Sequence, residues 1–255
     1  MGKQARYAAR GERIAEAAAQ RRARQRVRVV ASAGGLVIVG LVVAIVVSLV
    51  NAAGRDNGAD STALQKPYTS PTIATANGAL AFGKATAPVK LETYLDYMCP
   101  FCGRFERANG GEIDRMVADG TVRIELYPLS FLDRVSNGTR YSTRAANAVA
   151  TVAHRAPDKV LAFSNALFAS QPAEGTSGLS DDEIAKLASG AGVPSETVAQ
   201  FTEGIFEPWV AASTSAVFET GVTGTPTVKI NGTRFSGDLY AVGPLTRAVA
   251  AAKGQ

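Results

Sequence analysis

The sequence predicts an α/β protein whose sheet is interrupted by a helical insertion, with a single transmembrane helix ahead of that domain. Three observations predict this class. A basic tail precedes a charge-free apolar run at residues 29–50, two alternating strand patterns flank a helical stretch within residues 89–126, and a helical block separates them from a β-hairpin at residues 227–235. The 255 residues suffice for one or two globular domains.

Composition narrows the classes of function. Hydrophobic residues make up 46% of the chain and charged residues 19%, which excludes wholesale disorder because disordered chains combine few apolar residues with a large net charge. Two cysteines exclude a disulfide-dense scaffold. The single histidine argues against a histidine-built metal site and against a serine–histidine hydrolase.

The net charge of +5 is concentrated at the N-terminus. Residues 1–28 hold nine basic and two acidic side chains, so the other 227 residues carry a net charge of −2. A nucleic-acid-binding domain carries its basic residues on its folded surface. The charge therefore indicates membrane topology, and we expect no nucleic-acid partner.

The apolar run Val29–Val50 predicts a transmembrane helix. Its 22 residues contain no charge, and a helix of that length spans about 33 Å, which is about the thickness of a bilayer core. A buried helix of a soluble domain and a signal peptide cleaved near residues 50–52 are the alternatives.

Orientation follows from the residues that flank the apolar run. Five arginines lie within the fifteen residues before it, and only Arg55 lies within the fifteen after it. The positive-inside rule then leaves residues 1–28 in the cytoplasm. We expect a single-pass protein of the cell membrane whose extracytoplasmic domain, residues 73–255, follows a flexible linker at residues 51–72.

A strand–helix–strand unit opens the domain after the linker. Val89–Leu95 and Val122–Leu126 alternate apolar and polar side chains, and the segment between them has helical apolar spacing. Such a crossover implies a parallel pair of strands. Helices then occupy about residues 138–220, where Ser180–Glu183 has the pattern of a capping box.

The C-terminal part of the domain predicts a hairpin and a last helix. Thr227–Ile230 and Thr233–Phe235 are strand-like and are joined by Asn231-Gly232, the strongest short hairpin signal. A helix is expected over about residues 244–252.

The only cysteines, Cys99 and Cys102, are three positions apart. Covalent haem attachment needs a histidine at position 103, which is Gly103. Zinc or copper binding lacks a third cysteine, and a structural disulfide across so short a loop constrains little chain entropy. Redox dithiol chemistry needs only the pair and is favoured.

The expected position of Cys99 at the start of a helix supports the redox interpretation. Pro100 suits the first turn of a helix, which places Cys99 at the positive end of the helix dipole and lowers the pKa of its thiol. Cys102, one turn later, is positioned to resolve a mixed disulfide.

Three segments resemble landmarks of the DsbA-like thiol–disulfide oxidoreductases of the thioredoxin superfamily. Tyr94–Cys102 resembles their active-site segment, Gly83–Val89 resembles the lead into the first active-site strand, and Gly221–Val228 resembles their cis-proline loop. The resemblance covers about residues 75–255 and implies a thioredoxin-like fold with an inserted helical domain. The tail and apolar run are similar to the anchors of such proteins in actinobacteria.

The resemblance also implies roles for individual residues. Cys99 is the expected nucleophile, Cys102 the resolving cysteine, Pro226 the cis-proline facing them, and Thr225 the residue whose backbone contacts substrate. The redox-active disulfide itself serves as the redox group, so no cofactor and no metal are expected.

Two departures from the family pattern bear on these expectations. Phe101 stands where the best-known DsbA has a histidine, so we expect a less stabilised thiolate and a weaker oxidant. Related enzymes often bury a carboxylate six residues before the nucleophile, and this chain has Thr93 there. Asp96 or Glu92 could serve proton transfer instead, and a solvated loop residue is the alternative for Asp96.

The function expected from the resemblance is an extracytoplasmic oxidase that donates the Cys99–Cys102 disulfide to exported proteins as they fold. A membrane reoxidant of the DsbB or vitamin K epoxide reductase type would regenerate a monomeric enzyme. A reductase or isomerase kept in the dithiol state, a non-catalytic peptide-binding chaperone and a metal-delivery protein are the alternatives.

Overall fold

The computed structural model describes residues 68–254. The predicted cytoplasmic tail, the apolar run and nearly all of the linker lie outside these residues. Between residues 68 and 254, no helix has the length and apolar character needed to cross a membrane.

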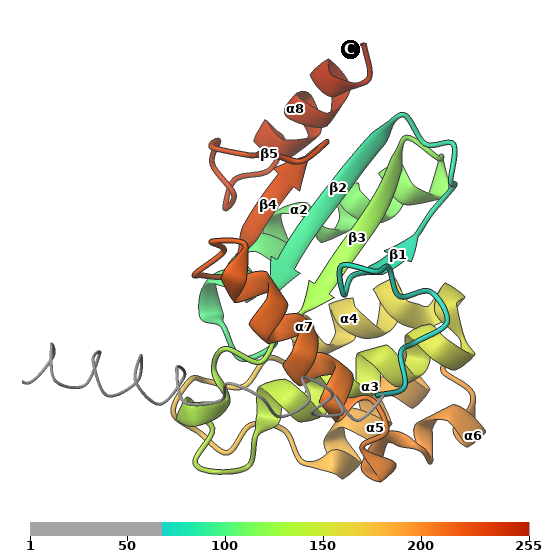
Figure 1. The fold of residues 1–255 in the computed structure, drawn as a ribbon, viewed down its shortest axis with the longest axis vertical. Coiled ribbons are helices and arrows are strands. Elements are labelled where there is room, and N and C mark those ends of the chain that lie inside the picture. The colour runs from blue at the N-terminus through green and yellow to red at the C-terminus, as the bar shows by residue number, and fades with distance from the viewer. Residues whose placement is uncertain (1–67, 255) are drawn as a thin grey trace, which may run out of the picture. The chain divides into compact units, whose positions relative to one another are not determined.

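A five-stranded mixed sheet forms the centre of the fold, in the order β1-β3-β2-β4-β5 (Figure 1). β2 and β3 are parallel, which confirms the predicted crossover, and the other neighbouring pairs are antiparallel. The strands are β1 (Leu80–Phe82), β2 (Val89–Leu95), β3 (Val122–Pro128), β4 (Thr227–Ile230) and β5 (Thr233–Arg234). The three-residue β1 is too short to give an alternating pattern, so the sequence did not predict it.

The crossover from β2 to β3 is the single helix α2 (Pro100–Ala118). Gly110 and Gly111 do not interrupt it, because Gly110 is buried and the apolar residues on either side share one face. Phe105, Ile113 and Met116 bury that face against the sheet and α4. Because α2 begins shortly after β2 ends, its N-terminus and the cysteines lie at the C-terminal end of β2.

The predicted helical block is an insertion of five α-helices between β3 and β4. The central helix α3 is alanine-rich and buried along almost its whole length, so its neighbours approach it closely. The α-helices are α3 (Tyr141–Arg155), α4 (Val160–Ala169), α5 (Asp181–Gly190), α6 (Ser195–Val198) and α7 (Glu207–Glu219), with short 3₁₀ turns at Asp133–Val135, Pro157–Lys159 and Phe201–Glu203.

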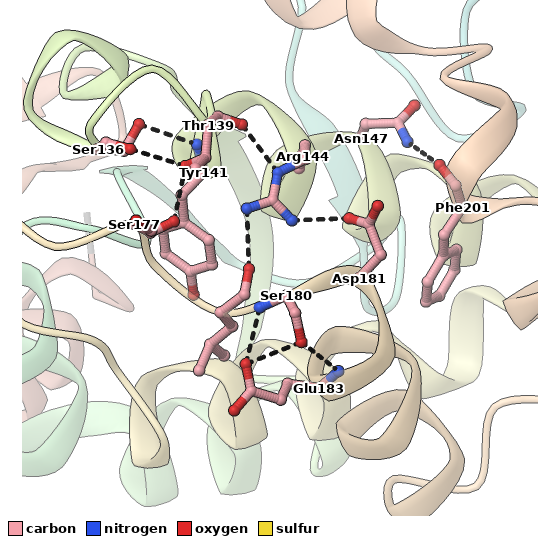
Figure 2. Close-up of polar contacts among 11 residues, drawn as sticks. Ser136, Thr139, Tyr141, Arg144, Asn147, Ser177, Ser180, Asp181, Glu183 and Phe201 are labelled. Carbon is pink, nitrogen blue, oxygen red and sulfur yellow. Dashed lines mark hydrogen bonds and ion pairs between the residues drawn. The ribbon is translucent and has the colours of Figure 1, made fainter.

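Arg144 connects α3 to the start of α5 within the insertion, as Figure 2 shows. Arg144 of α3 donates to the Thr139 carbonyl at 2.9 Å, to the Leu179 carbonyl at 2.8 Å and to the Asp181 carboxylate at 2.7 Å. The last two acceptors flank the start of α5, which the predicted capping box begins: the Glu183 N–H donates to the Ser180 hydroxyl, and the Glu183 carboxylate accepts from the Ser180 N–H.

The predicted hairpin is confirmed between β4 and β5. Asn231 and Gly232 both have positive φ, 49° and 84°, as a two-residue hairpin turn of the favoured hand requires. Asn231 also accepts a hydrogen bond from the Lys90 N–H at 2.8 Å, which fixes the turn beside β2. The last helix, α8 (Pro244–Ala252), buries Leu245 and Val249.

The polar positions of β2 and β3 are more buried than their alternation suggests. Glu92 and Glu125 are neighbours across the two strands and are only 7% and 9% exposed. Lys90 lies 3.5 Å from a carboxylate oxygen of each. Figure 1 shows α7 at the C-terminal ends of β2 and β3, on the side of the sheet away from α2, and Glu92 lines a hollow together with Ser213 and Val217 of this helix. The insertion thus supplies part of the cover that the strand pattern could not reveal.

Candidate active site

The two cysteines lie where β2 passes into α2. Cys99 is the N-cap residue of the helix, in extended conformation, and Pro100 begins the first turn. Cys99 is 5% exposed and Cys102 is fully buried, and both are free thiols in this structure. The backbone N–H groups of Cys102 and Gly103 bond to the Cys99 carbonyl, so the helix holds the two side chains in fixed relation.

The pKa values of the two thiols move in opposite directions. The pKa of Cys99 is lowered to about 6, chiefly by a hydrogen bond from the Cys102 thiol, with further hydrogen bonds from the Thr225 side chain and the first helical N–H groups acting against burial. Burial raises the pKa of Cys102 well above its usual value. Cys99 is therefore the thiolate-forming partner at neutral pH, and Cys102 stays protonated.

The loop before β4 meets the nucleophile. The Thr225–Pro226 peptide bond is cis, as the family resemblance implies. The Cys99 thiol donates to the Thr225 carbonyl at 3.4 Å. Residues separated by more than a hundred positions in the sequence thus form one site, and the structure brings together all four residues that the resemblance nominated.

Asp96 is buried in the turn between β2 and α2, so the solvated-loop alternative is wrong. One carboxylate oxygen accepts from the Met98 N–H at 2.8 Å and from the Ser142 hydroxyl at 2.7 Å, and the other accepts from the Leu132 N–H at 2.9 Å. Burial raises the pKa of Asp96 to about 6 despite these bonds. Its own N–H donates to the Cys102 sulfur at 3.5 Å.

Sequence reasoning missed a second support of the active-site turn. Gln171, just after α4, donates from its amide to the Cys99 carbonyl at 2.8 Å and to the Tyr97 carbonyl at 3.1 Å. Tyr97 in turn shares a hydrogen bond of 2.9 Å with Ser164 of α4. A glutamine 72 positions after the nucleophile carries no local signal of this contact, because the docking of the insertion creates it.

A second buried acid was also missed. Glu106 of α2 lines a small cavity together with Thr93, the residue at the family's carboxylate position. Burial, with the nearby charge of Asp114, raises the pKa of Glu106 to about 7. The Thr93 hydroxyl has no hydrogen-bond partner there. The buried carboxylate next to the family's position is thus supplied by Glu106 of α2, while β2 contributes Thr93.

Among residues 68–254, no three histidine, cysteine, aspartate or glutamate side chains are grouped closely enough to hold a metal ion. The lowered pKa of Cys99 beside the protonated thiol of Cys102 suits thiol–disulfide exchange with an incoming sulfur.

A thioredoxin-like sheet with a helical insertion, a low-pKa cysteine at a helix N-terminus and a cis-proline loop against it together define a DsbA-like thiol–disulfide oxidoreductase. The family model described as thioredoxin matches residues 75–241, and the chain belongs to this family.

Solved structures agree with this assignment. The reduced disulfide bond oxidoreductase DsbG of Mycobacterium tuberculosis is 26% identical, with 72% of this chain and 91% of that chain covered and a TM-score of 0.61. Oxidised DsbA of the same organism is 26% identical, with 69% and 93% covered and a TM-score of 0.59. MdbA of Actinomyces oris, a thiol-disulfide oxidoreductase, is 25% identical, with 73% and 91% covered and a TM-score of 0.62.

Curated relatives match a smaller part of the chain. The serine/threonine-protein kinase PknE of Mycobacterium tuberculosis is 38% identical over 120 residues, which are 46% of this chain and 21% of that protein. The chain thus spans about a fifth of the length of the curated relatives it matches.

Proposed function

We propose that the protein is an extracytoplasmic oxidase that donates the Cys99–Cys102 disulfide to exported proteins. The observation that carries this proposal is the lowered pKa of Cys99, to about 6. A stabilised thiolate favours the reduced enzyme, and an enzyme whose reduced form is stabilised gives up its disulfide readily. The value lies above the pKa of about 3.5 known for the strongly oxidising DsbA, which fits a milder oxidant.

The transfer proceeds through two exchange steps. A substrate thiolate attacks the Cys99 sulfur, the Cys99–Cys102 bond breaks, and Cys102 leaves and takes a proton because burial raises the pKa of its thiol. The second substrate thiolate then attacks the substrate sulfur of the mixed disulfide, and Cys99 leaves as a thiolate. Two electrons pass to the cysteine pair. One of the two substrate protons ends on Cys102 and the other goes to solvent.

The cis-proline loop fits the role of substrate support. In the oxidised enzyme Cys99 carries no thiol proton, so the Thr225 carbonyl becomes free to accept an N–H group of an extended substrate backbone. Pro226 and Thr225 are half-buried beside the nucleophile, which leaves room for such a strand on their outer side.

Asp96 fits the role of a positioning residue better than that of a proton carrier. Its two carboxylate oxygens already accept three hydrogen bonds, from the turn before Cys99, the loop after β3 and the first turn of α3. Proton transfer by Asp96 stays a prediction.

The location and the partner belong to the same proposal. The charge-free run at residues 29–50 and its arginine-rich flank support a membrane anchor with the catalytic domain outside. A membrane reoxidant of the DsbB or vitamin K epoxide reductase type would return the dithiol to the disulfide. A reductase or isomerase would instead keep the pair reduced, so alkylation of the cysteines in intact cells distinguishes the two directions.

The test uses the full-length chain with reduced, unfolded ribonuclease. The oxidised protein should speed the recovery of ribonuclease activity, and Cys99→Ser should abolish this effect. The matched variant Cys102→Ser keeps the Cys99 thiol but cannot form the Cys99–Cys102 disulfide, so it should also fail to speed the recovery. Equal recovery with and without the oxidised protein would refute the proposal.

A further inference from the structure

An exposed surface beside the nucleophile combines two aromatic rings and an arginine: Phe101, Arg104 and Tyr240, called here the aromatic–arginine surface. Phe101 lies between the two cysteines and is 51% exposed, and Tyr240 of the loop before α8 is 39% exposed. Phe101 and Arg104 are three residues apart on α2, so their side chains share a face of the helix.

Stacking holds the arginine in place. The guanidinium carbon of Arg104 lies 4.5 Å from the ring centre of Tyr240 and 5.7 Å from that of Phe101. The two ring centres are 6.0 Å apart and the rings are inclined at 47°, so the guanidinium lies against both rings. An arginine stacked in this way keeps its N–H groups available at the edge of its plane.

The charge on this surface has no partner in the described part of the chain. Arg104 forms neither a hydrogen bond nor an ion pair with residues 68–254, in contrast to Arg140 and Arg144, which pair with acids. Asp238 accepts a hydrogen bond from the Tyr240 N–H at 2.7 Å and forms no ion pair with Arg104. The helix N-terminus at Cys99 adds positive potential of the same sign.

Tyr240 also links this surface to the reacting sulfurs. Its ring packs 6.0 Å from that of Phe101, the residue next to Cys102, which places Tyr240 beside the active site. Burial raises the pKa of the Tyr240 hydroxyl, while the charge of Arg104 acts in the opposite direction. A segment whose cysteine reaches Cys99 can therefore place a neighbouring residue on the aromatic–arginine surface.

We propose that the aromatic–arginine surface selects substrates, binding extended cysteine-containing segments that carry a carboxylate close to the cysteine. The carboxylate pairs with the free edge of Arg104, and an apolar neighbour packs on Phe101. This inference rests on the proposed oxidase function and names the class of substrate for that site.

The size of the effect follows from the exposure of Arg104. Exposed ion pairs contribute little free energy, and the largest contributions measured for them correspond to about a fivefold change in a rate constant. The stacked guanidinium has lost part of its conformational freedom in advance, so we expect an effect near that upper part. Because the pair is exposed to solvent, added salt should weaken the preference.

The test compares three cysteine peptides that differ only at the residue next to cysteine, which is aspartate, asparagine or lysine. The second-order rate constant for reduction of the Cys99–Cys102 disulfide is measured with the full-length oxidised chain at low and high salt. We expect the aspartate peptide to react about fivefold faster than the lysine peptide once each rate is corrected for its own thiolate fraction. Arg104→Gln should remove the preference and Arg104→Glu should invert it.

The matched control is Arg115→Gln, because Arg115 is an exposed arginine near the far end of the same helix. This variant should keep the wild-type preference. Equal corrected rates for the three peptides, or an unchanged preference in Arg104→Gln, would overturn the inference and leave the oxidase function standing. Failure of all three peptides to reduce the disulfide would count against the oxidase function itself.

Discussion

The buried carboxylate of Asp96 should make the stability of the protein depend on pH. Burial raises the pKa of Asp96 from 3.8 to about 6 in the folded chain. The folded state therefore holds a proton that the unfolded state has already lost between about pH 4 and pH 6. Stability falls as pH rises through that window, and the difference in pKa corresponds to about 3 kcal/mol at pH 7.

Asp96→Asn isolates this contribution. The amide has the same shape, and its oxygen can still accept from the Met98 N–H and the Ser142 hydroxyl, while its NH₂ group faces the Leu132 N–H and loses that bond. The variant should thus show a stability offset that does not depend on pH. Between pH 4 and pH 7 the free energy of unfolding of the wild type should fall by about 3 kcal/mol more than that of the variant.

The assay is urea denaturation of the oxidised chain at half-unit pH intervals, since the disulfide removes the titration of Cys99. Ser142→Ala provides the matched comparison because it removes one hydrogen bond that lowers the pKa of Asp96. In Ser142→Ala the fall in stability should occur at higher pH. The free energy of unfolding at pH 7 should be about 1–3 kcal/mol lower than that of the wild type. Parallel pH profiles of stability for the wild type and Asp96→Asn would refute the explanation that ionisation of the buried Asp96 carboxylate lowers the stability of the fold.

Three further predictions concern the cysteine pair and its supports. In the reduced full-length chain, thiolate absorbance at 240 nm should titrate with a midpoint near pH 6, and Cys102→Ala should raise that midpoint because the Cys102 thiol supplies the largest stabilisation of Cys99; a wild-type midpoint above pH 8 would contradict this. Gln171→Ala removes the side-chain donor that the Tyr97 and Cys99 carbonyls share and should lower the free energy of unfolding by about 1–2 kcal/mol, with slower disulfide donation. Arg144→Ala should lower it by about 2 kcal/mol through the loss of three hydrogen bonds, with Arg155→Ala, an exposed change at the end of the same helix, as the control in urea denaturation.

The elements of this fold that the sequence predicts are those specified by residues close together in the chain. The Asn231-Gly232 turn and the Ser180 capping box each depend on side chains within a few positions, and both are present in the structure. The parallel crossover follows from the apolar periodicity of each of its three elements, and it is present as well. The position of Cys99 at a helix N-terminus follows in the same way from Pro100. Local sterics and hydrogen bonding favour the turn, the capping box and the helix start, so these features can be predicted from short segments.

The supports of the site could not be predicted from local patterns. Gln171 and Ser142 reach the active-site turn only because α3 and α4 dock beside it, and neither residue type signals such a role. The burial of Asp96 has the same origin, since a loop aspartate looks solvated until the insertion covers it. The helical insertion is therefore a structural part of the active site as well as a covering domain.

The structure assigns the acidity of the nucleophile and the recognition of substrate to different groups. Cys99 is stabilised as a thiolate by the Cys102 thiol, by Thr225 and by helical N–H groups, and Phe101 contributes to this only through its backbone. The side chains of Phe101 and Arg104 point instead into the exposed surface with Tyr240. Replacing the histidine of the best-known family member by phenylalanine thus removes one source of thiolate stabilisation and adds an apolar wall for substrate. It follows that substitutions of Arg104 should change the choice of substrate while the pKa of Cys99 stays near 6, so that oxidising strength and specificity can vary independently in this chain.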